Sequence, residues 1–226
     1  MPISLASLER GETLTEQVCQ KLREALGAGV FAPGERLTIR SVATSLGVSL
    51  TPAREALNIL AAEGALETAP NRTMIVAPLS IERLRVITEI RVALETVAGA
   101  TAASRLTDKE IAHAAAANDL LIAATEAKDF KQAVRHNHEF HFTIYAGARM
   151  PTLLKMIEGL WLRTGAYVNL IYPAFGLARK GVENHSRAAL AVKARDGAAL
   201  AACIETDIRL SSESLESELK TKVQAA

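Results

Sequence analysis

Apolar residues recur three or four positions apart along most of this 226-residue chain, a spacing typical of amphipathic helices. The first predicted helix begins at Thr13 and Glu16, which form a T-x-x-E capping box, and it ends at Gly27. Two shorter helices are predicted over residues 39–46 and 49–63, and each is closed by a glycine. The first sixty residues therefore predict three helices, of which the last two are joined by a tight turn.

The pattern changes from helical to extended spacing after residue 64. Residues 65–68 and 73–77 read as short strands, and Pro70, Asn71 and Arg72 lie between them. Asparagine tolerates the left-handed backbone region, so this connection predicts a tight β-hairpin. Two short helices followed by a hairpin are the order of elements in a winged helix-turn-helix.

Helical spacing resumes after Pro78 and continues along the remaining chain. Six further helices are predicted, at about 81–105, from the capping box at 107–110, at 129–147, 151–173 and 176–195, and from 197 to about 219. The sequence therefore predicts a mainly α protein in two parts. Residues 1–79 would form a winged helix-turn-helix with a small β-hairpin wing, and residues 80–226 an all-α helical bundle.

Composition narrows the classes of protein that fit this pattern. Aromatic residues make up only 4% of the chain, which favours helices over sheets. The net charge is +1, and residues 1–79 carry seven basic and eight acidic side chains. A non-specific DNA binder needs a surplus of positive charge, so this balance argues against that class.

Other features concern the cellular location of the protein. The two cysteines, Cys19 and Cys203, lie far apart and form no disulfide framework or ligand-spaced pair. No uncharged run reaches 18 residues and the N-terminus has no signal-peptide pattern, so no membrane association is expected. These features predict a cytoplasmic location.

The start of the third predicted helix carries residues suited to DNA. Ser49, Thr51 and Arg54 lie in or next to its first turn, where free N–H groups and the helix dipole favour phosphate. Arg54 lies one turn along the helix, within reach of a base edge or a phosphate. The alternative is that such arginines are merely solvated or paired, for instance with Glu55.

Residues 26–76 resemble the DNA-binding domain of the GntR family of bacterial regulators. The resemblance is carried by GVFAPGERL at 29–37, LGVS at 46–49, TPAREAL at 51–57 and LAAEG at 60–64, with Arg40 between them. It implies that the operator is contacted by Arg40, the start of the recognition helix, Arg54 and the wing tip. The full candidate set is Arg36, Arg40, Ser49, Leu50, Thr51, Arg54, Asn71 and Arg72.

One position departs from this family pattern, because relatives usually carry arginine where this chain has Leu50. Losing a bidentate guanine reader costs about 1–3 kcal/mol of base discrimination. A leucine could instead contact a thymine methyl group. We therefore expect an operator that differs from the commonest one in the family.

Residues 80–220 resemble the helical effector-binding domain of the FadR subfamily, known as the FCD domain, in its smaller six-helix, VanR-like variant. The matching stretches are IRVALE at 90–95, NHEFH at 137–141 and ENH at 183–185. The resemblance implies four metal ligands, namely Asn137, His141, His185 and Asp207. Such nitrogen and oxygen donors suit Zn²⁺, Ni²⁺ or Mn²⁺.

The residues themselves leave alternatives open. Asn137 and His141 are four positions apart, which puts them on one helix face as two ligands of one metal require. The same polar residues could line a pocket without metal, or His141 could be a hydrogen-bonded core histidine. Arg91 and Glu95 have the same spacing and could form a plain intrahelical ion pair.

The resemblance implies instead that Arg91 points into an effector cavity, where a guanidinium suits a carboxylate. The candidate effector contacts are Arg91, Glu95, Tyr145, Trp161 and Arg163. An enzyme is disfavoured, because the histidines at 138 and 141 do not have the H-E-x-x-H spacing of zincins and no phosphate loop or nucleophile elbow occurs.

These observations predict a transcriptional repressor or activator that is not an enzyme. Its expected partners are double-stranded operator DNA, a small carboxylate effector and a second copy of the chain in a homodimer. Effector binding would repack the helical part and change the position of the reading heads, with the motion absorbed near Pro78.

Overall fold

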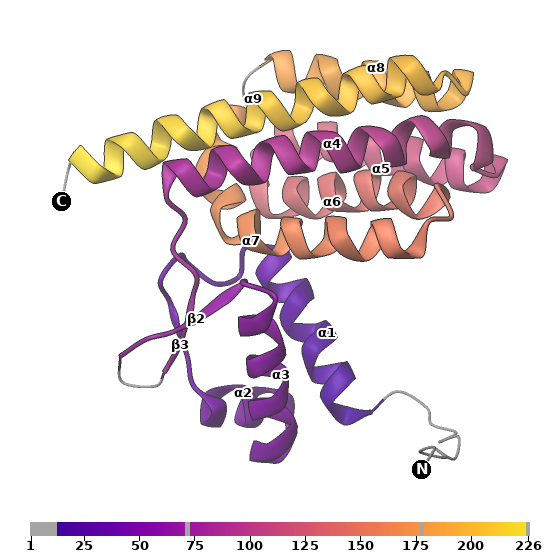
Figure 1. Cartoon of the computed structure of the whole chain (residues 1–226). Coiled ribbons are helices and arrows are strands. Elements are labelled where there is room, and N and C mark those ends of the chain that lie inside the picture. Colours follow the sequence, from indigo (N-terminus) through magenta and orange to yellow (C-terminus); the bar gives the residue numbers. More distant parts are fainter. Residues whose placement is uncertain (1–12, 71–72, 177–178, 225–226) are drawn as a thin grey trace, which may run out of the picture.

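The computed structural model describes residues 13–70, 73–176 and 179–224. Figure 1 shows two parts, a helical bundle and a smaller head that hangs beneath it. The described helices and the small sheet confirm the predicted mainly α fold with an N-terminal winged helix-turn-helix.

The head contains three helices and three short strands. They are α1 (Leu14–Gly27), β1 (Arg36–Leu37), α2 (Ile39–Leu46), α3 (Leu50–Ala62), β2 (Leu66–Thr68) and β3 (Met74–Val76). Thr13 and Glu16 form the predicted capping box, and Gly47 ends α2 with a left-handed φ of 65°. The antiparallel sheet has the order β1-β3-β2, with Arg36 opposite Ile75. Strand β1 was not predicted, because two residues are too few to show alternation.

The bundle consists of long helices. They are α4 (Ile81–Arg105), α5 (Asp108–Glu126), α6 (Phe130–Gly147), α7 (Pro151–Gly176), α8 (Arg179–Ala194) and α9 (Gly197–Gln224). The prediction that the helix beginning at Pro151 ends near Pro173 is wrong, because α7 continues to Gly176. A proline inside a helix removes one backbone hydrogen bond and crowds the carbonyl four residues earlier, but here the backbone stays helical through Pro173. No helix among the described residues is long and apolar enough to cross a membrane.

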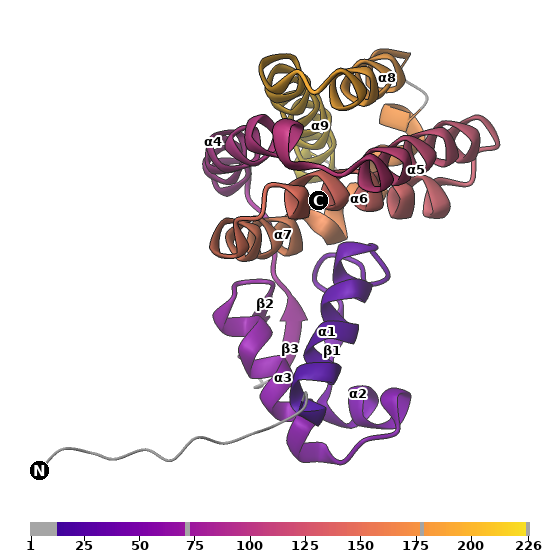
Figure 2. The ribbon, with the colours of Figure 1, turned by 90° about the vertical axis from the view of Figure 1, so that its right-hand side faces the viewer.

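Two large hydrophobic clusters make up most of the core, and a third, small one joins Leu121 of α5 to Ala133 and Val134 of α6. One of the large clusters fills the bundle, where α4 packs along α9 and α5 along α6. The other fills the head but also includes Leu160, Leu162, Ala166 and Tyr167 of α7 and Leu215 of α9. The head is therefore docked on the bundle through a shared core, and Figure 2 shows α7 between the two parts.

Candidate DNA-reading face and metal centre

The first turn of α3 is open to solvent. Ser49 is the N-cap residue with an extended backbone, but its side chain makes no capping hydrogen bond. Leu50 is 48% exposed, and Thr51 and Arg54 are exposed beside it. The free N–H groups of this turn and the positive end of the helix dipole are therefore available to a phosphate.

Three candidate DNA-contacting arginines lie on the same head. Arg36, Arg40 and Arg54 are exposed, and none of their side chains has a hydrogen bond or ion pair with another residue that the structure describes. Glu55, the partner considered for Arg54, accepts instead from the Thr15 hydroxyl at 2.6 Å. These guanidinium groups are free to bind phosphate or base edges without breaking an existing pair. The predicted wing-tip contacts, residues 71 and 72, lie outside the described residues.

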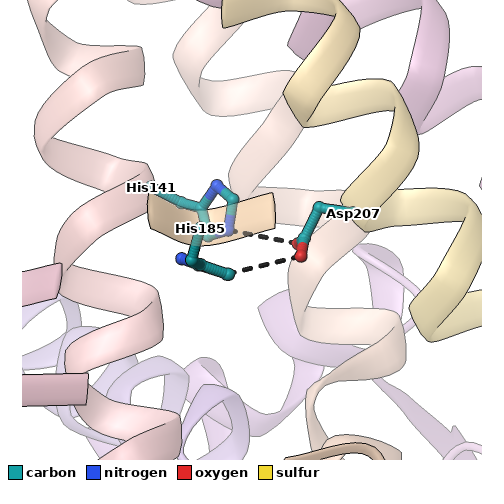
Figure 3. A group of neighbouring side chains, drawn as sticks. All are labelled: His141, His185 and Asp207. Atoms are coloured by element: carbon teal, nitrogen blue, oxygen red, sulfur yellow. Dashed lines mark ion pairs between the residues drawn. The ribbon is translucent and has the colours of Figure 1, made fainter. Parts of the chain in front are cut away.

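Three helices of the bundle bring together three of the four predicted metal ligands. His141 comes from α6, His185 from α8 and Asp207 from α9 (Figure 3). The Nε2 atoms of His141 and His185 each lie 3.3 Å from a carboxylate oxygen of Asp207. The potential ligand atoms of the three residues lie within 4.8 Å of one another, and none of the three residues is more than 9% exposed.

The chemistry of this group fits a divalent cation. His141 Nε2 and Asp207 Oδ1 are buried without a hydrogen-bond partner among the described residues. Such unsatisfied buried atoms are costly, and a shared cation would satisfy both. Two imidazoles and one carboxylate suit Zn²⁺, Ni²⁺ or Mn²⁺.

The protonation states of the group also favour metal binding. Burial lowers the pKa of His141, although neighbouring Asp207 opposes the shift, so its imidazole is neutral at pH 7. Burial alone would raise the pKa of Asp207, but His185 and His141 outweigh it and hold that pKa well below its usual range. A neutral imidazole and an ionised carboxylate are the forms that bind a metal.

The fourth predicted ligand, Asn137, lies one helical turn before His141 on α6 and is half-buried. The three grouped residues each come from a different helix, and Asn137 would add a second donor from α6. The assignment of Asn137 as a ligand stays a prediction.

A chain of hydrogen bonds leads from Arg91 to the candidate metal centre. Arg91 Nε donates to Glu95 Oε1 at 2.6 Å, and the Tyr145 hydroxyl donates to Glu95 Oε2 at 2.6 Å. The same hydroxyl lies 3.2 Å from His141 Nδ1. Because Tyr145 donates to Glu95, it can only accept from His141, which places the histidine proton on Nδ1. Nε2 then presents its lone pair to the metal position.

This geometry revises the roles predicted for Glu95 and Tyr145. Glu95 is completely buried, and both of its oxygens already accept hydrogen bonds from Arg91 or Tyr145, so in this structure it holds those two side chains. Tyr145 is 1% exposed and holds His141. The i, i+4 pair of Arg91 and Glu95 does form, but it is buried and belongs to the support of the metal ligands rather than to the surface.

Arg91 and Trp161 lie together. The guanidinium carbon of Arg91 is 4.7 Å from the centroid of the indole ring, within cation–π range. Burial opposes the charge of Arg91, but Glu95 outweighs it and raises the pKa of Arg91. Trp161 also lies edge-on to Phe142 at 5.2 Å and packs 5.4 Å from the ring of His141. Both residues thus lie beside the trio.

Arg163, by contrast, lies at the junction with the head rather than in this group. Its Nε donates to the backbone carbonyl of Glu63, at the C-terminal end of α3, at 2.9 Å. Two residues along a helix turn the side chain by about 200°, so Arg163 and Trp161 point in nearly opposite directions. The predicted effector contact is replaced by a contact between the two parts of the molecule.

Two further residues of α7 join this junction and were missed by sequence reasoning. The Tyr167 hydroxyl accepts from Leu79 N at 2.7 Å and donates to Ala77 O at 3.3 Å. At Gly165, an added Cβ would lie 2.8 Å from the Leu26 carbonyl oxygen of α1. Neither residue stands in a recognisable motif, so the sequence offered no signal for either contact.

Comparison with known proteins agrees with both halves of this description. Residues 14–76 match the model of the bacterial regulatory proteins of the gntR family, and residues 86–210 match the FCD domain. The HTH-type transcriptional regulator McbR of Escherichia coli (strain K12) is 37% identical over 81% of this chain and 84% of its own length. The Nta operon transcriptional regulator of Aminobacter aminovorans is 35% identical over 58% of this chain and 61% of its own.

Solved structures show the same relationship. The structure of E. coli McbR/YncC covers 92% of this chain and 99% of its own, with a TM-score of 0.84 and 33% identity. A GntR regulator from Rhodococcus sp. RHA1, at 20% identity and a TM-score of 0.72, shares the fold over 89% of this chain and 96% of its own. The relatives are transcriptional regulators rather than enzymes. The chain therefore belongs to the GntR family of bacterial transcriptional regulators and carries an FCD effector-binding domain.

Proposed function

We propose that this regulator binds double-stranded operator DNA through the open face of α3 and responds to a small carboxylate bound beside a divalent metal. The observation that carries the proposal is the buried trio of His141, His185 and Asp207, whose unsatisfied donor atoms converge from three helices. When bound, the metal would supply a Lewis-acid anchor for a carboxylate oxygen. The trio would hold it, with Zn²⁺, Ni²⁺ or Mn²⁺ as candidates.

Arg91 supports a carboxylate as the effector class. Its hydrogen bonds to Glu95 use Nε and one terminal nitrogen, Nη2, which leaves Nη1 for a ligand. The side chain is held rigidly between Glu95 and Trp161, so little side-chain entropy would be lost on binding. A charged fork with one free donor suits an anionic oxygen.

Helix α7 would transmit effector binding to the head. Trp161 lies beside the trio, Arg163 caps the end of the recognition helix, and Tyr167 holds the backbone on both sides of Pro78. A shift of Trp161 on effector binding would move the contacts of Arg163 and Tyr167, which lie two and six residues further along the same helix. The linker is thus clamped at rest, and we infer that the effector changes the strength of this clamp.

A homodimer is supported by the outer face of α4. Val86, Ile90 and Val97 are 60%, 42% and 49% exposed, and Ala93 and Ala100 are exposed between and beyond them. Their spacing of four, three, four and three is that of a helix-pairing seam. A second copy packed on this seam would present two reading heads to two operator half-sites.

The metal proposal is tested by calorimetric titration of the full chain with Zn²⁺, Ni²⁺ and Mn²⁺. Asp207→Ala should weaken binding by more than about a hundredfold, since loss of even an outer-sphere partner costs 10–100-fold. Glu205→Ala is the matched control, because that carboxylate lies on the same helix but pairs with Arg209 at the surface. Equal affinity of the Asp207 variant and the wild type would refute the assignment.

Regulation is tested by gel shift on a DNA fragment from upstream of the protein's own gene. We expect binding by the apo chain and a change in affinity when Zn²⁺ and succinate, as a probe carboxylate, are added together. Arg91→Ala should abolish the response to succinate and preserve Zn²⁺ binding. If none of a panel of small carboxylates changes the operator affinity of the metal-loaded protein, the effector proposal is wrong. The metal assignment is tested separately, by the calorimetric titration.

A further inference from the structure

A pocket of about 380 Å³ opens between the head and the bundle. It is bounded on one side by α1, including Arg23 and Gly27, and on the other by α6 and α7, including Arg135, Phe142 and Trp161. Its volume falls in the range of small-molecule sites, and such sites occur preferentially at domain interfaces. None of the trio of candidate metal ligands lines it.

The wall of the pocket is aromatic. His138 and Phe142 stack with ring centroids 4.0 Å apart and planes within 14° of parallel, and Trp161 meets both of them edge-on. A planar ring placed against this wall would gain stacking and edge contacts.

The charged groups of the pocket distinguish an anionic ligand from a cationic one. Arg135 lies on α6 three residues before His138 and seven before Phe142, so it shares their helix face. It has no ion-pair or hydrogen-bond partner among the described residues. Arg23, Glu24 and Glu158 also line the pocket. Arg23 is paired with Glu63 and Glu24 with Lys21, which leaves Arg135 and Glu158. Burial raises the pKa of Glu158 and so disfavours its charged form, although Arg23 and Lys155 oppose the shift. The guanidinium of Arg135 is therefore the stronger of the two unpaired charges.

We infer that this junction pocket is a second small-molecule site, separate from the metal centre, which takes an aromatic carboxylate. The ring lies against His138, Phe142 and Trp161, and the carboxylate faces Arg135. Trp161 forms a common wall, because its ring also lies over Arg91 on the side of the metal centre. A ligand here touches α1 of the head and α7 of the bundle at once, so it bridges the two parts.

The test is calorimetric titration of the full-length protein with 2-naphthoate as the probe. Gly27→Phe fills the pocket, because an added Cβ at Gly27 meets no atom within 4 Å. We expect it to reduce affinity at least about tenfold, or about 1.4 kcal/mol. Gly159→Phe is the matched control, since Gly159 on α7 has equally open space but does not line the pocket. It should leave affinity unchanged.

Two charge variants test the ligand class. Arg135→Ala should weaken 2-naphthoate about two- to fivefold, as expected for a solvent-accessible ion pair, and Glu158→Gln should strengthen it by a similar factor. Neutral 2-naphthamide should bind more weakly than 2-naphthoate, and neither substitution should change its affinity. Affinity for 2-naphthoate should be the same with Zn²⁺ and with EDTA.

Three results would overturn the inference. Undetectable binding of 2-naphthoate would show that no such site exists. Binding that requires Zn²⁺ and survives Gly27→Phe would place the ligand at the metal centre instead. Tighter binding of 2-naphthylmethylamine than of 2-naphthoate, with opposite effects of the Arg135 and Glu158 variants, would show that the pocket selects cations. None of these results would change the outcome of the Zn²⁺ titration, so failure of this inference can be distinguished from failure of the metal assignment.

Discussion

The reading face of the head and the metal centre of the bundle use charged residues in opposite ways. Arg40 and Arg54 are exposed and have no partner within the described chain, so they are free for DNA. Glu95 and His141 are buried, and each is held by a specific neighbour. A surface that binds a partner keeps its charges unpaired, whereas a centre that must hold a geometry pairs almost all of them. This difference predicts that substitutions in the metal centre lower stability, whereas substitutions on the reading face lower DNA affinity.

The largest expected effect is on stability, from Glu95→Ala. This change leaves the buried Arg91 without its counter-ion and should cost about 3–5 kcal/mol of unfolding free energy. Urea denaturation measures it, with Glu110→Ala as the control, because Glu110 forms an exposed pair with Arg149. If both variants lost less than about 1 kcal/mol, the buried pair would not contribute in the way that its geometry implies.

The second effect is on DNA affinity and leaves stability unchanged. Arg54→Ala should cost about 1–3 kcal/mol of operator binding by fluorescence anisotropy, because it removes a cation that has no structural partner. Its melting temperature should match that of the wild type. Arg149→Ala, also a surface arginine but on the bundle, should bind operator normally. A melting temperature that falls together with DNA affinity would contradict the contrast between the two regions.

A third effect is expected where the two regions meet. Tyr167→Phe removes the acceptor for Leu79 N and the donor to Ala77 O, and an unsatisfied buried donor costs about 1–3 kcal/mol. The rate of amide hydrogen exchange should increase more at residues 77–79 than in the helices of the bundle. Unchanged protection of this segment would show that Tyr167 does not clamp the linker.

The smallest effect concerns an exposed charge. The backbone N–H and hydroxyl of Thr107, together with Arg149, lower the pKa of Glu110 to about 2. Because the folded pKa lies below the ordinary value of 4.5, its contribution to stability is present above about pH 4.5 and is lost as the pH falls towards 2. Glu110→Gln should flatten the pH dependence in this window by less than about 1 kcal/mol. Acid titration followed by circular dichroism measures this effect, and a larger change would contradict the small stabilisation expected of an exposed ion pair.

The sequence predicted local features well, because their signals are local. The capping boxes at Thr13 and Thr107 and the left-handed Gly47 form as the pattern indicated. His141 and His185 could be predicted because matching family stretches contain them, and Asp207 because the resemblance implies a ligand late in the final helix. The fold brings the three together.

What the sequence could not predict are the contacts between distant segments. Tyr145 reaches Glu95 across 50 positions, and Arg163 reaches Glu63 across 100. Neither pair has a spacing that marks it, because the partner of a side chain on a bundle helix depends on the packing of helices. Arg163 shows the consequence most clearly, since residue type alone suggested a ligand contact where the fold makes a structural one.

The close approach at Gly165 bears on how this family could exchange its parts during evolution or in the laboratory. A Cβ at that position would lie 2.9 Å from the Cα of Gly27 as well as 2.8 Å from the Leu26 carbonyl, so backbone meets backbone there. A bundle transplanted from a relative would accept this head only if it also had a glycine at the position of Gly165, whereas Gly27 is not itself required, because a Cβ there meets no atom within 4 Å. Chimeras that exchange operator specificity can therefore be cut within the linker at Pro78, provided that the bundle they receive keeps this glycine.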